Sequence, residues 1–294
     1  MCCKKLVWLG LFFFVLLNCP LKAQKLLLGG SGWDKIVIID KETKAIEWEY
    51  PMRRGWECNS VAFASDGDIL FSYRKGAKLI TRSKDELWKI EAPDGCEMQT
   101  AMVLPNGNFL LAWCGSPAVI LEVDPRGEIL SKTEFDTQIE DSHSQFRQVI
   151  RNKDGNYVIP LLATSEICEV SIDGQLLRSI KIGGNPFSAA PLENGNYLIA
   201  CGDAHCYKEL NFRTGEVVNT VTRDDIAGAR LFFVAQLLPL ANGNTYICNW
   251  QGHSHIDGSV SYPQLVEVNS EGEMVWSLND NAAFGMISAI SIID

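Results

Sequence analysis

Basic residues are few in this sequence. It contains 26 Lys and Arg against 36 Asp and Glu, which gives a formal net charge of −10 at pH 7. Residues 1–24 hold three of the lysines and no acid, so removing them takes the net charge from −10 to −13. Nucleic acids and anionic membranes repel a chain this acidic, and we expect neither as a partner.

A cysteine framework is lacking as well. Seven of the 10 cysteines follow residue 24, and their odd number and irregular spacing are not those of a disulfide scaffold or a zinc ribbon. Two of them, Cys168 and Cys248, fall in strand-like runs, where a free Cys behaves as a small hydrophobe. Cys201 and Cys206 are close enough in sequence to bridge the ends of one loop, and the sequence leaves that pairing open.

A long apolar run occurs once, at the N-terminus. Two lysines precede the run Leu6–Leu17 and Ala23 follows it, which predicts a signal peptide over residues 1–24. The run is too short to remain as a membrane-spanning helix of the mature chain. Cys19 supports an alternative, a lipoprotein signal that ends before it and leaves a lipid anchor on this residue. Both interpretations predict export to a periplasm or a cell surface.

What the sequence does contain is a repeated tight turn. Asn-Gly or Asp-Gly recurs every 40 to 48 residues, at Gly67, Gly107, Gly155, Gly195 and Gly243. This dipeptide between apolar runs is a strong hairpin signal, because the turn needs residues that tolerate positive φ. One strand-like run precedes each turn and three follow it. Four strands per repeat at this period are typical of the blades of a β-propeller.

The two ends of the chain complement each other. Residues 25–50 match the second, third and fourth strands of a repeat, whereas residues 287–294 match an isolated first strand. We therefore predict an all-β single domain over residues 25–294. It is a six-bladed propeller of four-stranded blades, closed by the C-terminal strand, which completes the N-terminal blade. Such closure removes free sheet edges.

The repeat resembles the quinoprotein-like (PQQ-like repeat) and arylsulfotransferase-like propellers of bacteria. It has their order of strand, Leu-Pro-Asn-Gly-Asn turn, strand, Glu-Val-Asp and Gly turn, followed in three repeats by Trp48, Trp88 or Trp276. In quinoproteins this Trp docks one blade on the next. The resemblance implies a fold and not an activity. PQQ is not expected, because quinone-dependent dehydrogenases have eight blades and a vicinal cysteine pair. Sulfotransfer is not expected either, because the catalytic histidines of arylsulfotransferases have a counterpart only near His143.

One face of the predicted disc carries the irregular loops, which are where function concentrates on a rigid scaffold. All four histidines fall on this loop face: His143, His205, His253 and His255. The longest loop lies in the last repeat, where Gln251 and the two histidines after it resemble the metal cluster of oligogalacturonate-lyase propellers. Histidines at i and i+2 of an extended segment point to one side. His205, His253 and His255 are therefore the candidate ligands of a divalent metal, the only cofactor suggested. The alternative is a loop ordered by Trp250 and Tyr262.

The first strands of the repeats predict the lining of the central channel. A polar residue occupies one equivalent position in every blade: Ser60, Thr100, Gln148, Ser188, Gln236 and Ser288. This ring predicts a hydrated channel. One position earlier, Asn59, Gln99 and Arg147 face an apolar arc, and Trp56, Glu57 and Glu97 lie toward the channel mouth.

Basic and aromatic residues on the loop face suggest an acidic sugar, because a guanidinium binds a carboxylate and an aromatic face packs on a sugar ring. The candidate ligand-binding residues are Trp56, Asn59, Gln99, His143, Arg147, His205, Arg230, Trp250, Gln251, His253 and His255. The leading prediction is an exported monomer that binds a small molecule, an acidic oligosaccharide or an envelope protein on this face, without chemistry of its own.

Two other classes stay open. One is a polysaccharide-cleaving enzyme with Glu57, Glu97, His143 and Arg147 as candidate catalytic residues. In a lyase, a metal or Arg147 would neutralise the uronate and a histidine or Lys75 would act as base. In a glycoside hydrolase, Glu57 and Glu97 would form the carboxylate pair. The other class is a scaffold for assembly of the cell envelope.

Overall fold

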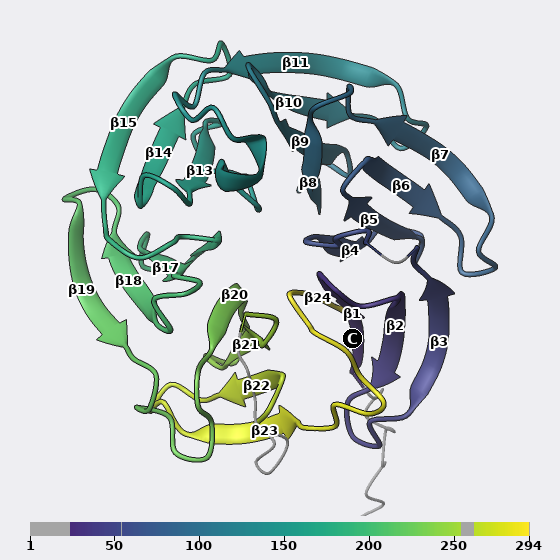
Figure 1. Ribbon diagram of the computed structural model, residues 1–294, viewed down its shortest axis with the longest axis vertical. Coiled ribbons are helices and arrows are strands. Elements are labelled where there is room, and N and C mark those ends of the chain that lie inside the picture. Colours follow the sequence, from purple (N-terminus) through teal and green to yellow (C-terminus); the bar gives the residue numbers. More distant parts are fainter. Residues whose placement is uncertain (1–23, 54, 254–261, 294) are drawn as a thin grey trace, which may run out of the picture.

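The computed structural model describes residues 24–53, 55–253 and 262–293. Six antiparallel sheets of four strands each stand as blades around a central axis (Figure 1). This confirms the all-β, six-bladed propeller that the repeat predicts. One short helix, η1 (Ser142–Ser144), is the only helix in these ranges. Nothing in the described part of the chain forms a helix of sufficient length and apolarity to cross a membrane. Residues 1–23 of the predicted signal segment lie outside the described ranges.

The first three blades follow one another along the chain, each listed from the axis outward. Blade one contains β24 (Ala289–Ile293), β1 (Lys25–Gly29), β2 (Lys35–Asp40) and β3 (Ile46–Pro51). Blade two contains β4 (Val61–Phe63), β5 (Ile69–Tyr73), β6 (Gly76–Ile80) and β7 (Glu86–Glu91). Blade three contains β8 (Glu97–Val103), β9 (Phe109–Cys114), β10 (Ala118–Val123) and β11 (Ile129–Phe135).

The remaining blades repeat the same order. Blade four contains β12 (Ile150–Arg151), β13 (Tyr157–Leu161), β14 (Glu166–Val170) and β15 (Leu176–Lys181). Blade five contains β16 (Ser188–Pro191), β17 (Tyr197–Ala200), β18 (Tyr207–Asn211) and β19 (Glu216–Val221). Blade six contains β20 (Phe233–Pro239), β21 (Thr245–Trp250), β22 (Leu265–Val268) and β23 (Met274–Leu278).

The ring closes where the two ends of the chain meet. β24 pairs antiparallel with β1, from Lys25 opposite Ile293 to Gly29 opposite Ala289. In Figure 1 the yellow C-terminal strand lies beside the purple N-terminal one. The predicted closure of the first blade by the last strand is thus confirmed. Residues separated by the whole length of the chain hold the disc together.

The core consists of apolar layers between neighbouring blades. The middle strands are buried on both sides, as in β9, where all six residues are inaccessible, so they read as continuous apolar runs. Between blades one and two, for example, Ile38 packs in one cluster with Ile69 and Phe71. The outermost strands alternate between exposed and half-buried residues because only one of their faces meets another blade.

Tryptophans of the outer strands dock blades one, two and six onto the blade that follows each of them. The indole N–H of Trp48 donates to the carbonyl of Arg82 at 2.8 Å, and that of Trp276 to the carbonyl of Lys41 at 3.0 Å. Trp88 makes the equivalent bond to Pro125. Blade four has Arg178 at this position, and its guanidinium donates to the carbonyl of Arg213 at 3.0 Å. The docking role therefore survives a change of residue type.

Replacing Trp88 by alanine should lower the free energy of unfolding by about 3 kcal/mol, because removal of the large indole would leave a void between the blades. Trp88 is 9% exposed, packs against Phe109 and lies over Gly127. Trp88→Phe keeps most of the packing and loses the hydrogen bond to Pro125, so it should cost only about 1 kcal/mol. Urea unfolding of both variants tests this. A Trp88→Ala midpoint equal to that of the wild type would contradict the docking role.

The predicted ring of polar residues around the axis is present, but its side chains are bonded to protein rather than left facing a channel. Ser60 donates to the carbonyl of Ala101 in the next blade at 2.9 Å, and Gln236 to that of Ile290 at 3.0 Å. Gln148 reaches across the axis to the carbonyl of Asn59 in blade two and to the side-chain oxygen of Gln236 in blade six. Six blades bring the innermost strands close enough for these side chains to bind one another.

Candidate functional site

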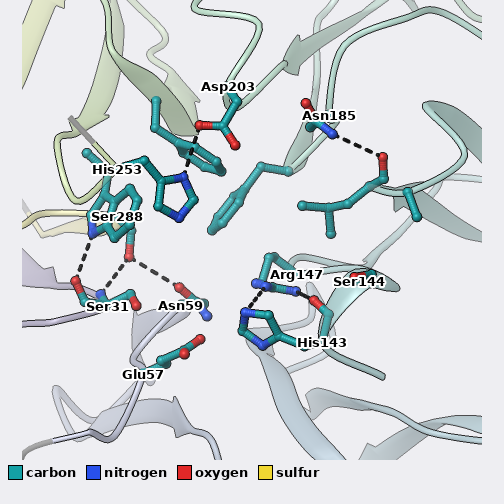
Figure 2. Close-up of a pocket in the computed structure, with 15 residues that line it drawn as sticks. Ser31, Glu57, Asn59, His143, Ser144, Arg147, Asn185, Asp203, His253 and Ser288 are labelled. Atoms are coloured by element: carbon teal, nitrogen blue, oxygen red, sulfur yellow. Dashed lines mark hydrogen bonds and ion pairs between the residues drawn. The ribbon is translucent and has the colours of Figure 1, made fainter. Parts of the chain in front are cut away.

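A cavity of about 340 Å³ opens at the centre of the loop face (Figure 2). Its lining residues come from every blade except the third: Ser31, Glu57, Asn59, His143, Ser144, Arg147, Leu162, Ala163, Asn185, Phe187, Asp203, Phe233, Trp250, His253 and Ser288. Of the predicted site residues, the structure gathers Glu57, Asn59, His143, Arg147, Trp250 and His253 in this one cavity.

The repeat explains why these residues meet. Five of them stand at, or within three residues of, the start of an innermost strand: Asn59, Arg147, Phe187, Phe233 and Ser288. Every innermost strand enters the disc from the loop face, so its first residues surround the axis there. The loops between the second and third strands supply most of the remaining wall.

One wall of the cavity is a chain of charged groups. The Nδ1 atom of His143 lies 2.8 Å from Oε2 of Glu97, and Arg74 forms an ion pair with the other carboxylate oxygen. The Nε2 atom of His143 lies 3.2 Å from Nη2 of Arg147. This arrangement assigns the His143 proton to Nδ1, because the guanidinium can only donate. Glu97 itself does not line the cavity and orients the ring of His143.

Arg147 is buried but has no acidic partner. It is 7% exposed, and its Nη1 atom donates to the carbonyls of His143 and Phe146 at 2.8 and 2.9 Å. Among the residues that the structure describes, no carboxylate lies within ion-pair distance of this guanidinium. Two backbone bonds hold the group at the cavity wall, and no carboxylate of the described residues pairs with its charge.

The pKa of Glu97 is lowered. Burial opposes its ionisation, but the hydrogen bond and charge of His143 and the contact with Arg74 outweigh burial. A lowered pKa in the folded state means that Glu97 stabilises the fold fully above its ordinary pKa of 4.5, and that this contribution is lost as the pH falls through the folded value.

Replacing Glu97 by glutamine should therefore lower the unfolding free energy by about 2 kcal/mol at pH 7, since the negative charge is lost and an amide NH2, which is a donor, replaces one of the two acceptor oxygens that His143 and Arg74 contact. The difference from the wild type should shrink as the pH falls below about 4.5, where the carboxylate of the unfolded chain becomes protonated, and on through the lower pKa of the folded protein. Urea titrations between pH 7 and pH 3 measure it. A gap that stays constant over this range would show that the Glu97 charge is not the cause.

The opposite wall is aromatic (Figure 2). The ring of Trp250 meets that of Phe233 edge-on with centroids 5.3 Å apart, and its indole N–H donates to the carbonyl of Ser31 at 2.7 Å. His253 stands perpendicular to Trp250 at 4.7 Å, with its Nδ1 atom 3.0 Å from Oδ1 of Asp203. His253 and Asp203 are largely exposed, so this pair positions the ring and adds little stability.

Hydrogen bonds also fix the polar edge of the cavity. The amide of Asn59 donates to Gln99 at 2.8 Å, and its side-chain oxygen receives the hydroxyl of Ser288 at 3.4 Å. Gln99 is fully buried and lies behind Asn59 rather than in the cavity. Glu57 lines the cavity and has no ion-pair partner among the described residues.

Other predicted site residues lie elsewhere. Trp56 stacks on Tyr73 with ring centroids 4.3 Å apart. Arg230 lines a separate hollow beside Tyr262, and the side-chain amide of Gln251 donates to the backbone carbonyls of Tyr262 and Pro263. These three residues support the rim and do not line the cavity.

The structure does not assemble a metal centre in its described ranges. The Nδ1 atom of His205 is bonded to the carbonyl of Phe232, while that of His253 is bonded to Asp203. His255 lies outside the described residues. No group of three or more potential ligands occurs in the part of the chain that is described.

Several cavity residues were not among the candidates from the sequence: Ser31, Ser144, Leu162, Ala163, Asn185 and Phe233. Their common signal is position, since each stands in a loop of the loop face or at the start of an innermost strand. Phe233 was hidden by an irregular register in β20, which shifts between Val234 and Leu237. Aligning the repeats by their turns does not reveal such a shift.

Residues 24–273 match the protein family described as Mal s 1 allergenic protein-like. The chain belongs to this family. The match differs from the quinoprotein-like and arylsulfotransferase-like families that the repeat resembles; the propeller architecture is what they share. Among curated proteins, none matches the chain.

Solved structures agree with the fold. A crystal structure of a Bacteroides caccae protein of unknown function is 61% identical, has a TM-score of 0.90, and the alignment covers 92% of this chain and 99% of that one. A catalytically inactive virginiamycin B lyase of Staphylococcus aureus with quinupristin is 14% identical (TM-score 0.57; 89% and 86% covered). A chain of a nidogen–laminin complex is 12% identical (TM-score 0.64; 92% and 98% covered). The last two likenesses support the fold alone.

Proposed function

We propose that this propeller binds a small acidic sugar in the cavity of the loop face, with the sugar carboxylate on Arg147. The observation that carries the proposal is the buried guanidinium of Arg147, which has no carboxylate partner among the described residues and faces a cavity. Such a group attracts an anion, because an uncompensated buried charge is costly. A planar guanidinium binds a carboxylate through two parallel hydrogen bonds.

The opposite wall suits a ring with one apolar face. Trp250, Phe233 and Phe187 supply rigid apolar surface, and the Trp250 indole is held by Ser31. Ligand pockets combine such surfaces with a few placed polar groups. Here the polar groups are Asn59 and Glu57, which suit the hydroxyls of a sugar. Near 340 Å³, the cavity fits one sugar or the end of a short oligosaccharide better than a long chain.

Calorimetric titration of residues 25–294 with galacturonate and with neutral galactose tests the proposal. We expect measurable binding of galacturonate that weakens with added salt, and at least tenfold weaker binding of galactose. Equal affinities would exclude recognition of the carboxylate. If acidic sugars of several types do not bind, the hypothesis of a sugar ligand is rejected and an envelope protein becomes the proposed partner.

A second candidate function is favoured by His143, whose ring Glu97 orients beside Arg147. In a uronide lyase, Arg147 would neutralise the carboxylate and His143 would remove the C5 proton. The bond from C4 to the glycosidic oxygen would break, a C4–C5 double bond would form, and the leaving oxygen would take up a proton from water to become a hydroxyl. The ultraviolet absorbance of unsaturated product from oligogalacturonides measures this. No absorbance change, or an equal rate in His143→Gln, would dismiss the lyase.

Export remains part of the proposal and rests on residues 1–24 alone. Fractionation of cells that produce the full chain, with sequencing of the mature N-terminus, distinguishes cleavage near residue 24 from a lipid anchor at Cys19. Recovery of the uncleaved chain from the cytoplasm would contradict both.

A further inference from the structure

Cys201 and Cys206 face each other where the loop between β17 and β18 begins and ends. The ladder of these strands ends with Ala200 opposite Tyr207, so the cysteines occupy the next opposed position. The Cys201 N–H donates to the Cys206 carbonyl at 3.0 Å, and both thiols are free, with the Cys201 Sγ atom 3.6 Å from the carbonyl oxygen of Ile199. Opposed residues in an antiparallel pair have Cα atoms about 4.5–5.5 Å apart, which a disulfide can span.

We infer that Cys201 and Cys206 form a reversible disulfide that holds Asp203 in place at the cavity. The bridge would close the loop of residues 202–205 at its base. Within this loop, Gly202 pairs with Val234 of blade six, and Asp203 binds His253 on the cavity wall. In the reduced protein only hydrogen bonds keep the loop in this position.

The two thiols are suited to different steps of disulfide formation. Cys206 is 6% exposed whereas Cys201 is fully buried, so an oxidant reaches Cys206 first. The neighbouring Cys201 thiol lowers the pKa of Cys206, burial opposes this shift, and the charge of Lys208 adds to it. The neighbouring Cys206 thiol and burial both raise the pKa of Cys201. Cys206 is thus the attacking thiolate and Cys201 the resolving thiol.

The oxidant is a disulfide, either glutathione disulfide or the active-site disulfide of a thiol oxidoreductase. The Cys206 thiolate attacks one sulfur of it, which forms a mixed disulfide and releases the other sulfur as a thiol after protonation. Cys201 then loses its proton and attacks the Cys206 sulfur, which releases the second thiol. The two cysteines lose two electrons and two protons, and the oxidant disulfide becomes two thiols.

Trapping in glutathione redox buffers tests the pair. The protein is equilibrated at several ratios of glutathione disulfide to glutathione, alkylated, and mapped by mass spectrometry. We expect the peptide with Cys201 and Cys206 to lose both alkylation sites under oxidising conditions. The five other cysteines of the described residues should stay alkylatable after unfolding: Cys58, Cys96, Cys114, Cys168 and Cys248. Persistence of both alkylation sites at every ratio would overturn the inference.

Single variants test the order of the steps. Cys201→Ser should accumulate glutathione on Cys206, because the resolving thiol is missing, whereas Cys206→Ser should leave Cys201 unmodified. The reverse pattern would overturn the assignment of roles.

Hydrogen exchange tests the link to Asp203. In the oxidised protein, amides 202–205 should exchange at least tenfold more slowly than in the reduced protein. Equal exchange would refute control of the loop, whatever the cavity binds.

Discussion

Galacturonate binding should weaken by about a hundredfold when Arg147 is replaced by glutamine. The guanidinium is 7% exposed and already fixed by the carbonyls of His143 and Phe146, so it offers a preorganised charge to the carboxylate. A charge-assisted pair of hydrogen bonds in a buried place is worth about 1.5–3 kcal/mol, and a hundredfold change corresponds to about 2.7 kcal/mol. Calorimetric titration of wild type and variant measures the ratio.

Two controls separate recognition from damage to the fold. Arg230→Gln removes a positive charge from the same face but outside the cavity, so it should change galacturonate affinity less than twofold. Galactose affinity should be nearly equal in the wild type and Arg147→Gln, because galactose has no carboxylate. If Arg147→Gln weakens the binding of galacturonate and galactose equally, the Arg147 side chain shapes the site through the backbone of His143 and does not recognise the charge of the ligand.

Replacing Gly30 by alanine should lower the free energy of unfolding by about 4 kcal/mol and the melting temperature by about 10 °C. A Cβ atom on Gly30 would lie 1.6 Å from the carbonyl oxygen of Met286 and 2.7 Å from its carbonyl carbon. Both atoms belong to the backbone that leads into β24 and cannot move aside like a side chain. The change therefore pushes the closing strand away from β1.

Gly107→Ala is the matched control. Gly107 has φ of +84° in an exposed turn, and nothing lies within 4 Å of the added Cβ atom. It should cost only about 1 kcal/mol, the cost of a left-handed conformation. Thermal and urea unfolding of both variants measure the difference. If Gly30→Ala is no less stable than Gly107→Ala, the contact between β1 and β24 is not what closes the disc.

The fold was largely predictable because each repeat carries its own turn chemistry and apolar runs. Three Asn-Gly and two Asp-Gly turns mark the first hairpin of five blades, and the ends of the chain supply the sixth. The docking tryptophans were also predictable, although Arg178 in blade four shows that the carbonyl acceptor matters more than the indole. These features are local in sequence, so a single chain is enough to read them.

The site was predictable only in part. The repeat places His143 and Glu97 one blade apart, 46 residues along the chain, but it says nothing of which side chain turns toward the other. The structure makes Glu97 the support of His143, with Arg74 behind it. Glu57, at the equivalent position of blade two, instead lines the cavity, so the same backbone position serves different purposes in adjacent blades.

The sequence by itself determined the all-β class, the number of blades, the closing strand and the face that carries the irregular loops. Tertiary structure alone decided that Gln148 spans the axis to Asn59 and Gln236, and that Arg147 faces Trp250 across a cavity with no acidic partner in the described part of the chain. The physical reason is range. Turn preference and strand patterning act over a few residues. Closing a disc of six blades instead brings together side chains separated by 88 or 89 positions, whose charges and shapes then select their partners.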